Sequence, residues 1–477
     1  MIDTAVILAA GNGTRLRGVS GGLPKPLVPL AGVPIIVRVM RAAQDAGIRR
    51  FVIVTGHQAD RLRTAIAGHP AVSAEITWVH NPDYASRSNG TSALAARAAV
   101  GAPFALLMGD HIFDVGTLRR LLRTPINPGE CILAVDRKIS QVFDLEDATK
   151  VAELDGRLEA IGKELAAYNA IDTGMFLCTP ALFDALRAVQ DESDGKLSDA
   201  ILWLARRGRM RTFDIGKALW QDVDTPAMRR EAERRLGETL RKPTDGPISR
   251  LINRRISIPI SLVLARTGIA PNQISAFNLL LGTAAGLLFA TTSYPVLALA
   301  GILLQSASIL DGCDGEVARL TLRQSVRGQW VDTITDNASY IAFLVGLGIG
   351  QYRREPTEVT VWFGLVALAA VVTGLAVVYR RIHSVGKGSL LDFKIPPRDL
   401  VDAGTGRVFW IYEQLLPLIR RDVLAFGCGI LALANLPALI YGLWVVGTVM
   451  FMVGAIHITS QRVQRQVTPA AAVAKKA

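Results

Sequence analysis

The chain has few cysteines, and its N-terminus lacks the pattern of a secretory leader. Its four cysteines, Cys131, Cys178, Cys313 and Cys428, are scattered over 477 residues without the paired spacing of a zinc site or a disulfide framework. We therefore expect buried thiols in a reducing compartment. The apolar stretch from residue 6 to residue 10 is too short for a leader and runs into glycines. The first half of the chain is accordingly expected in the cytoplasm.

A net charge of either sign is nearly absent from the first half, whereas the second half is basic. Residues 1–240 hold 30 Lys and Arg against 28 Asp and Glu, and residues 241–477 hold 23 against 13. Half of the residues are hydrophobic, and the mean hydropathy is +0.31. A chain of this length is expected to form two or three domains. The composition predicts a soluble enzyme domain followed by a membrane domain that faces anionic lipid or phosphate substrates.

Short apolar runs alternate with amphipathic stretches in the first half. This alternation predicts a Rossmann-like α/β domain over residues 1–241, with ligands at the carboxyl ends of parallel strands. The domain is expected to end in a charged helix over residues 225–241, followed by a turn-rich linker at 242–247. The expected buried strands are Ala5–Ala10, Arg50–Thr55, Phe104–Met108 and Ile132–Val135, and the expected crossover helices include Ile35–Ala46 and Asp60–Ala67.

Long uncharged stretches fill the second half and predict an all-α membrane domain over residues 248–466. It would consist of an interfacial helix at Ile248–Ala265 and six transmembrane helices. The Ala- and Lys-rich tail at 467–477 is expected to be disordered. The expected spans are two between Thr267 and Leu310, one at Trp330–Gly350, one at Val359–Tyr379, and two within Val423–Gln461.

The loops between these spans differ in charge. One set carries little or no net positive charge, while the loops after the second, fourth and sixth spans are rich in Arg and Lys. By the positive-inside rule the basic loops are cytoplasmic, and an even number of spans returns both termini there. We therefore expect a multi-pass protein of the cell (inner) membrane whose active sites face the cytoplasm.

A glycine-rich turn follows the first expected strand. The string Leu8-Ala-Ala-Gly-Asn-Gly-Thr-Arg-Leu16 leads into Pro24-Lys-Pro-Leu27. Glycines allow backbone N–H groups to approach a phosphate closely, and Arg15 and Lys25 can neutralise a triphosphate. These strings, together with Gly109-Asp-His111 and Trp220-Gln-Asp-Val-Asp-Thr-Pro226, resemble the sugar-nucleotide-type nucleotidyltransferases over residues 3–235.

The resemblance implies transfer of a nucleotidyl group from a nucleoside triphosphate to a phosphate, with release of pyrophosphate. Asp110 and Asp224 would then hold Mg²⁺, with Mn²⁺ as the alternative, and Arg15 and Lys25 would be catalytic. Lys163 would hold the acceptor phosphate, although a solvated surface lysine fits its sequence equally well. The residues implied in nucleotide binding are Leu8, Ala10, Gly11, Gly13, Asn89 and Thr91.

Four carboxylates stand at the cytoplasmic ends of the second and third expected spans. Asp311 and Asp314 are three residues apart, and Asp332 and Asp336 are four apart, so each pair shares one helical face. Ionisable groups at a membrane span are costly and therefore indicate function. Two facing pairs would form an oxygen cage for one or two divalent cations.

The complete string Asp311-x2-Asp314-Gly315-x2-Ala318-Arg319-x8-Gly328-x3-Asp332-x3-Asp336 resembles the signature of the CDP-alcohol phosphotransferases over residues 248–465. Such enzymes transfer a phosphoalcohol from a CDP-activated donor to a hydroxyl and release CMP. The resemblance implies that all four carboxylates bind Mg²⁺ or Mn²⁺ and that Asp336 is also the catalytic base. Gly315, Ala318, Arg319 and Gly328 would contact the donor nucleotide. Arg380, Arg381 and Lys387 either hold an anionic acceptor or only set the topology.

The order of the two halves resembles one bifunctional family, the inositol-1-phosphate cytidylyltransferase/CDP-inositol:inositol-1-phosphate transferases. The resemblance implies that CTP and inositol 1-phosphate give CDP-inositol, which then reacts with a second inositol 1-phosphate to give phosphorylated di-inositol phosphate. It further implies a homodimer formed through the membrane domain, a lipid bilayer as surroundings, and no nucleic-acid partner. Another phosphoalcohol, or transfer to a lipid hydroxyl in phospholipid synthesis, stays open. A front domain that only binds nucleotide and a transporter are the non-enzymatic alternatives.

Overall fold

The computed structural model describes residues 2–11, 13–16, 21–101, 103–190, 195–385 and 420–473. The chain divides into two compact units, Met1–Glu238 and Thr239–Ala477. The boundary falls at the end of the charged helix α8 (Pro226–Thr239). Residues 242–247, which we expected to form a linker, belong to the second unit.

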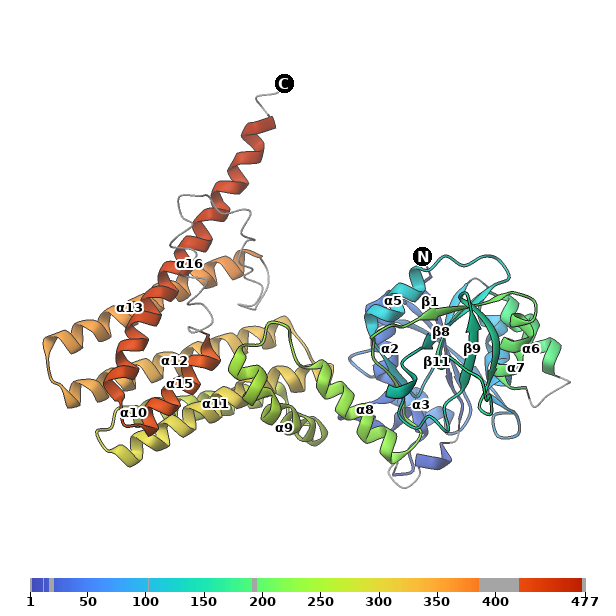
Figure 1. The fold of residues 1–477 in the computed structure, drawn as a ribbon, viewed down its shortest axis with the longest axis horizontal. Coiled ribbons are helices and arrows are strands. Elements are labelled where there is room, and N and C mark those ends of the chain that lie inside the picture. The colour runs from blue at the N-terminus through green and yellow to red at the C-terminus, as the bar shows by residue number, and fades with distance from the viewer. Residues whose placement is uncertain are drawn as a thin grey trace. The chain divides into compact units, whose positions relative to one another are not determined.

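A nine-stranded mixed sheet forms the centre of the first unit (Figure 1), in the order β5-β4-β1-β6-β11-β8-β12-β10-β9. Two short pairs, β2 with β3 and β7 with β13, lie outside it. The strands are β1 Thr4–Ala9, β2 Pro29–Leu30, β3 Val33–Pro34, β4 Arg50–Thr55, β5 Glu75–His80, β6 Phe104–Met108, β7 His111–Phe113, β8 Cys131–Asp136, β9 Lys150–Leu154, β10 Arg157–Gly162, β11 Ala170–Cys178, β12 Met210–Asp214 and β13 Trp220–Asp222.

The four strands that the sequence predicts are present, but the sheet is not purely parallel. Strands β4, β1 and β6 are parallel neighbours, with Leu8 opposite Met108. Strand β11 lies between β6 and β8 and is antiparallel to both. β8 therefore runs in the same direction as β6. The carboxyl ends of all four predicted strands consequently share one edge of the sheet, as expected.

Helices cover both faces of this sheet, with α2 and α5 on one side and α6 and α7 on the other (Figure 1). Helix α2 stops where Gly47, at φ 121°, donates its N–H to Ala43 O, and α5 starts where Asp114 accepts from Thr117 N at 2.8 Å. The helices of this unit are α2 Ile35–Ala46, α3 Ala59–Ala67, α4 Asn89–Ala95, α5 Val115–Arg123, α6 Ala181–Gln190, α7 Leu197–Ala205 and α8 Pro226–Thr239.

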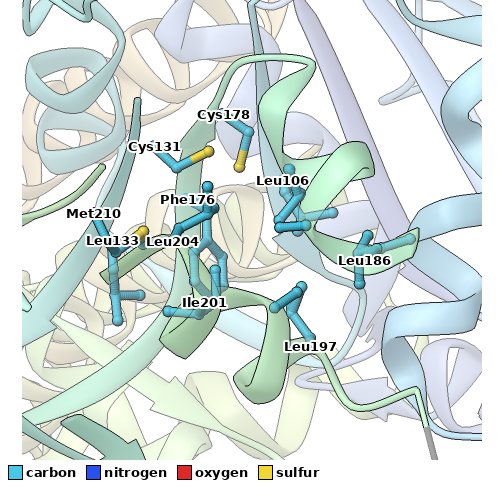
Figure 2. Packing of buried hydrophobic residues seen from close by; sticks show 14 of the residues in the cluster. Leu106, Cys131, Leu133, Phe176, Cys178, Leu186, Leu197, Ile201, Leu204 and Met210 are labelled. Carbon is cyan, nitrogen blue, oxygen red and sulfur yellow. The ribbon is translucent and has the colours of Figure 1, made fainter. Parts of the chain in front are cut away.

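The core between the sheet and α6/α7 is apolar and closely packed. Figure 2 shows Phe176 of β11 and Leu133 of β8 among Leu186, Ile201 and other side chains of these helices. All four cysteines of the chain are buried and unpaired, which confirms the expectation drawn from their spacing. Burial of such aliphatic and aromatic side chains supplies the main stabilisation of the sheet.

The second unit is helical throughout the part of it that the structure describes. A short π-helical turn at Ser249–Asn253 leads into α9, where the sequence predicts an interfacial helix. Among the described residues six further helices then follow at the positions of the expected spans, and α16 continues past residue 466, where we expected the tail to begin. The helices are α9 Arg254–Thr267, α10 Pro271–Phe289, α11 Tyr294–Leu320, α12 Val326–Arg354, α13 Glu358–Val385, α15 Arg421–Leu433 and α16 Pro437–Val473.

Four of these helices are long and apolar enough to cross a membrane by themselves: Pro271–Phe289, Tyr294–Leu320, Glu358–Arg380 and Pro437–Ile456. Helix α12 carries several charged and polar residues, and the described part of α15 has 13 residues, so neither meets this criterion. The second unit is therefore a helical domain with four candidate spans.

Helices α11 and α12 both pack against α10 in the bundle. Helix α11 also packs against α9 and α15. At the α10–α12 crossing, a Cβ on Gly346 would collide with the backbone of Gly286. Phe289 and Phe343 meet edge to face nearby, with ring centroids 4.7 Å apart. This packing holds the signature residues of α11 and α12 at one end of the bundle.

Candidate active sites

In the first unit, two strand ends bring Asp110 and Asp224 together. Asp110 follows the carboxyl end of β6, where Gly109 donates its N–H to Leu8 O of β1 at 3.0 Å. Asp224 follows β13, which pairs with β7 directly after Asp110. Val223 N also donates to Asp110 O at 3.1 Å. The two aspartates, 114 positions apart in the sequence, therefore lie beside each other at the ligand-binding edge of the sheet.

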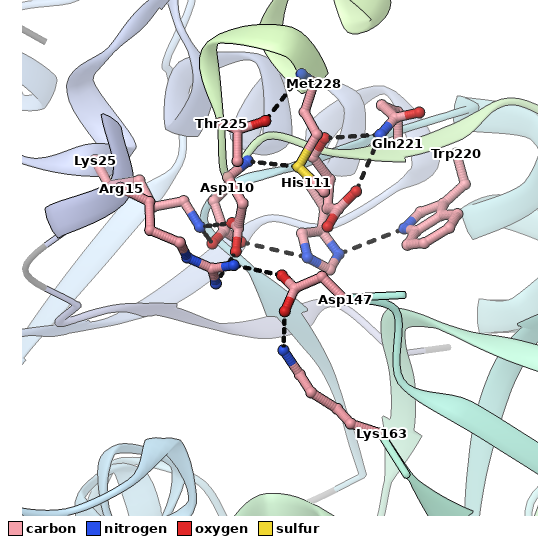
Figure 3. A network of polar contacts seen from close by, with 12 residues as sticks. Arg15, Lys25, Asp110, His111, Asp147, Lys163, Trp220, Gln221, Thr225 and Met228 are labelled. Atoms are coloured by element: carbon pink, nitrogen blue, oxygen red, sulfur yellow. Dashed lines mark hydrogen bonds and ion pairs between the residues drawn. The ribbon is translucent and has the colours of Figure 1, made fainter. Parts of the chain in front are cut away.

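Lys25 joins these two carboxylates. Its ammonium forms ion pairs with both Asp110 and Asp224 (Figure 3). Burial opposes the charged form of Lys25, but the two aspartates raise its pKa above the usual value. Burial likewise opposes ionisation of Asp110, yet Lys25 and His111 lower its pKa to about 2. Lysine and aspartate are therefore both charged at neutral pH.

The glycine-rich turn packs directly on Lys25. Gly13 has φ +57°, and a Cβ at this position would lie 2.5 Å from the Cβ of Lys25. A side chain at residue 13 would thus push Lys25 away from the aspartates. The turn has a steric function here in addition to any contact with phosphate.

Arg15 and Lys163 meet at a third carboxylate, Asp147. Arg15 lies 2.5 Å from Asp147 and 2.5 Å from Asp224, and Lys163 lies 2.5 Å from Asp147 (Figure 3). Burial tends to raise the pKa of Asp147, but the two cations lower it below its usual value. Two cations predicted from distant motifs are therefore brought to one place by an aspartate that the sequence analysis did not single out.

A cavity of about 940 Å³ opens beside this network. Asn89, Asp110, Lys163 and Asp224 line it. Arg15 and Lys25 contact its wall through their ion pairs. The remaining predicted nucleotide-binding residues, Leu8, Ala10, Gly11, Gly13 and Thr91, are not among its described lining residues.

Two further lining residues, His111 and Asp172, were not singled out from the sequence. His111 Nδ1 lies 2.9 Å from Thr173 O and 3.4 Å from the indole Nε1 of Trp220. Asp172 accepts from Gly174 N at 2.7 Å, and burial raises the pKa of Asp172 to about 6. Asp172 lies inside strand β11, where an isolated aspartate carries no motif. For His111, the available signal was its place at the end of the Gly109-Asp-His111 string.

In the second unit, helices α11 and α12 bring the four signature aspartates to one end of the bundle. Carboxylate oxygens of Asp311, Asp332 and Asp336 lie within 4.8 Å of one another. Asp314 accepts from Ser275 Oγ of α10 at 2.5 Å and from Gly315 N. Three acidic oxygens at this separation fit a divalent cation, because hard cations prefer such ligands. The fourth carboxylate is held by hydrogen bonds at the side of this cluster.

A cavity of about 280 Å³, here called the α10–α12 cavity, adjoins the cluster. Six of the eight signature residues line it, and Asp311 and Asp336 do not. The six are Asp314, Gly315, Ala318, Arg319, Gly328 and Asp332. Arg319 Nε is buried and has no hydrogen-bond partner among the described residues. An orphaned guanidinium donor of this kind is suited to an anionic ligand.

Asp311 and Asp336 face a different, smaller cavity, which Tyr340 and Ala425 also line. At this side Arg421 of α15 forms an ion pair with Asp336 at 2.7 Å and lies over the ring of Tyr340 at 4.4 Å. Arg421 Nη2 is buried and has no hydrogen-bond partner within the described ranges of the chain. The sequence analysis missed Arg421 because it precedes the fifth span without a motif, among other basic residues that topology explains.

Of the predicted acceptor residues, Arg380 is exposed near the C-terminal end of α13. The side chain of Arg381 and the whole of Lys387 lie outside the described part of the structure. Arg421 is instead the described cation beside Asp336.

Each half of the chain matches a known protein family. Residues 5–202 match the model of the MobA-like NTP transferase domain, and residues 268–397 match that of CDP-alcohol phosphatidyltransferase. The "Bifunctional IPC transferase and DIPP synthase" of Thermococcus kodakarensis is 35% identical over 439 residues, which cover 91% of this chain and 95% of that protein. The chain belongs to this bifunctional family. The protein of the same name from Rubrobacter xylanophilus is 38% identical over 73% of this chain and 78% of its own.

A solved structure, the inositol-1-phosphate CTP transferase from T. maritima, is 25% identical and has a TM-score of 0.43, over 49% of this chain and 95% of that one. The two ranges of this chain that match family models contain Lys25, Asp110 and all four signature aspartates. Asp224 and Arg421 lie beyond these ranges, and it is the structure that connects them to the rest of each site.

Proposed function

We propose that the first unit joins CTP to inositol 1-phosphate and that the second unit transfers phosphoinositol from the resulting CDP-inositol to another inositol 1-phosphate. An oxygen of the sugar-alcohol phosphate attacks the α-phosphorus of CTP, and pyrophosphate leaves. In the second reaction, a hydroxyl of the acceptor attacks the inositol-bearing phosphorus of CDP-inositol, and CMP leaves. The product is phosphorylated di-inositol phosphate.

The contact of Lys25 with two aspartates supports the first reaction. One ammonium reaches both Asp110 and Asp224, so the two carboxylates are close enough to hold one cation. They would hold Mg²⁺ or Mn²⁺, which supplies charge neutralisation between the reacting phosphates. Lys25 and Arg15 bind and orient the triphosphate, while Lys163 on the cavity wall binds the acceptor phosphate.

The position of Asp336 supports the second reaction. Asp311, Asp332 and Asp336, whose carboxylate oxygens lie within 4.8 Å of one another, would hold Mg²⁺ or Mn²⁺ at the donor diphosphate, with Asp314 beside them. Asp336 takes the proton from the attacking hydroxyl. Arg421 pairs with Asp336 and has one donor group without a partner among the residues that the structure describes, and this group binds the phosphate of the acceptor.

The observation that carries the proposal is the presence of two separate, equipped sites on one chain. One has the cations and carboxylates for a triphosphate, and the other has the carboxylates and arginines for a CDP-activated donor. The product of the first reaction is the substrate of the second. The similarity to "Bifunctional IPC transferase and DIPP synthase" relatives over most of the chain supports inositol 1-phosphate as the phosphoalcohol.

We further propose that α10–α13, α15 and α16 are six transmembrane helices with both termini in the cytoplasm of the cell that makes the protein. The basic residues at the ends of α11, α13 and α16 support this orientation. The carboxylates of α11 and α12 then face the cytoplasm, where the first unit releases its product. A homodimer formed through the membrane domain belongs to the same proposal.

The test uses purified full-length protein with CTP, Mg²⁺ and a panel of phosphoalcohols, with pyrophosphate and CMP measured separately. We expect pyrophosphate release with inositol 1-phosphate, but not with phosphocholine or glycerol 3-phosphate, followed by CMP release. Pyrophosphate release with another member of the panel would replace inositol as the substrate. Absence of pyrophosphate with every member would refute the two-step scheme. A lipid product in vesicle-containing reactions would identify a lipid hydroxyl as the acceptor.

A further inference from the structure

The segment between the two predicted domains contributes a side chain to the second active site. We propose that Lys242 binds the diphosphate of the CDP-activated donor in the α10–α12 cavity. This inference rests on the transfer reaction proposed above. It assigns a substrate-binding residue to a stretch that the sequence describes only as a turn-rich linker.

The first argument is the position of Lys242. Its side chain lines the α10–α12 cavity together with Asp314 and Arg319 of α11 and Asp332 of α12. The carboxylates that would hold the metal and the cations that would bind the phosphates therefore border the same space. A metal-bound diphosphate needs both kinds of group around it.

Cationic side chains outnumber carboxylates at the wall of this cavity, three to two. Lys242, Arg319 and Arg323 all line the cavity, and within the described part of the chain none of the three forms an ion pair. Burial lowers the pKa of Lys242, and the nearby Arg319 and Arg254 lower it further. A bound anion would offset this repulsion. The diphosphate of the donor is the anion that the proposed reaction brings to this place.

The third argument is that Lys242 is held in a fixed turn. Its backbone N–H donates to Asp245 Oδ2 at 2.8 Å, and Asp245 N donates to Lys242 O at 3.0 Å. Arg254 of α9 binds Asp245 at 2.9 Å and Glu316 of α11 at 2.5 Å. Asp245 is 9% exposed and Glu316 is fully buried.

Glu316 also accepts hydrogen bonds from Ser257 and Ser261 of α9, at 2.8 and 2.7 Å. The chain Lys242–Asp245–Arg254–Glu316 thus connects the turn to the helix that carries Asp311 and Asp314. Lys242 contacts the donor directly, whereas Asp245, Arg254 and Glu316 are positioning residues. A tether of arbitrary sequence would need none of these contacts.

The experiment compares Lys242→Met and Lys242→Arg with the wild-type full-length protein in detergent and Mg²⁺. Lys217→Met is the matched control, because Lys217 is an exposed lysine of the first unit. Four quantities are measured: the KM for CDP-inositol in CMP release, the inhibition constant of CMP, the inhibition constant of cytidine, and pyrophosphate release from CTP. Lys242→Gln replaces the methionine variant if that variant is not recovered from the membrane.

We expect Lys242→Met to raise the KM for CDP-inositol and the inhibition constant of CMP by roughly 10- to 100-fold, the value of one charge-assisted hydrogen bond. The inhibition constant of cytidine should not change, because cytidine has no phosphate, and pyrophosphate release should equal that of the wild type. Lys242→Arg should recover most of the loss. Asp245→Asn should give a smaller shift in the same direction.

Two results would overturn the inference: a wild-type affinity of Lys242→Met for both CDP-inositol and CMP, or an equal loss for CMP and cytidine. The first would mean that Lys242 does not touch phosphate, and the second that it only supports the fold. If the wild-type protein released no CMP from CDP-inositol, the proposed transfer reaction would fail. Equilibrium binding of CMP and of cytidine to the wild type and to Lys242→Met would then decide whether Lys242 binds phosphate.

Discussion

Replacing Lys25 with methionine removes the cation between two carboxylates while keeping most of the side-chain volume. In the structure, Lys25 pairs with Asp110 and Asp224, and its side chain is 14% exposed. Loss of one partner from such a poorly solvated group of charges costs about 3 kcal/mol, the lower end of the range for buried pairs. The first unit of Lys25→Met should be destabilised by this amount in the absence of divalent cations.

Added Mg²⁺ should compensate for the loss. The ammonium of Lys25 and a metal ion compete for the same two carboxylates, so its removal should tighten Mg²⁺ binding by at least about tenfold, or roughly 1.4 kcal/mol. A ligand at 100 times its Kd stabilises a folded domain by about 2.7 kcal/mol. The variant should therefore gain more thermal stability from Mg²⁺ than the wild type does. Its pyrophosphate release should nevertheless fall, because the triphosphate loses a cation.

The assay is differential scanning calorimetry of the full-length protein in detergent, with EDTA and with increasing Mg²⁺, following the transition of the first unit. Arg15→Met is the control, because Arg15 also touches Asp224 but is 53% exposed and should cost less than about 1 kcal/mol. Equal stability of Lys25→Met and wild type in EDTA, or an equal response of both to Mg²⁺, would refute the shared-site reasoning.

Three further outcomes follow from particular contacts. Arg421→Met should raise the KM for inositol 1-phosphate in CMP release by roughly 10- to 100-fold, and a change confined to the KM for CDP-inositol would contradict its assignment to the acceptor. Burial raises the pKa of Asp172 to about 6. Ionised Asp172 is therefore unfavourable in the folded state, and the free energy of unfolding decreases as pH rises from about 4 to 6. In calorimetry, Asp172→Asn should then be more stable than wild type by up to about 3 kcal/mol at pH 7 and by nothing below pH 4; an advantage independent of pH would count against this cause. Gly346→Ala should destabilise the second unit by about 1–3 kcal/mol, whereas Gly348→Ala, which meets only ordinary contacts, should change its melting little; equal shifts would contradict the close helix crossing.

Much of the first unit could be predicted because its signals are local. Helix α2 has the predicted bounds, Ile35–Ala46, since its apolar residues follow one face and Gly47 ends it. Strand β11 escaped prediction because Asp172 and Gly174 interrupt its apolar run, and its antiparallel insertion between β6 and β8 depends on pairing that no local pattern records. The sequence could therefore predict the ligand-binding edge but not the complete strand order.

The candidate sites divide in a similar way. The signature aspartates could be predicted because fixed spacing on a helix determines which residues share a face. Asp147 and Arg421 could not, because each reaches its site only through tertiary packing, as the 2.5 Å contact of Arg15 with Asp147 and the 2.7 Å contact of Arg421 with Asp336 illustrate. Lys242 was taken for part of a linker, since a turn-rich composition does not reveal which cavity a turn borders.

We propose that two independent sites on one chain act in sequence. The decisive experiment supplies CTP and inositol 1-phosphate to Asp110→Asn and Asp336→Asn proteins and follows pyrophosphate, CDP-inositol and CMP. Asp336→Asn should release pyrophosphate, accumulate CDP-inositol and form no CMP. Asp110→Asn should form CMP only when CDP-inositol is supplied from outside. Loss of both activities in either variant would contradict the claim.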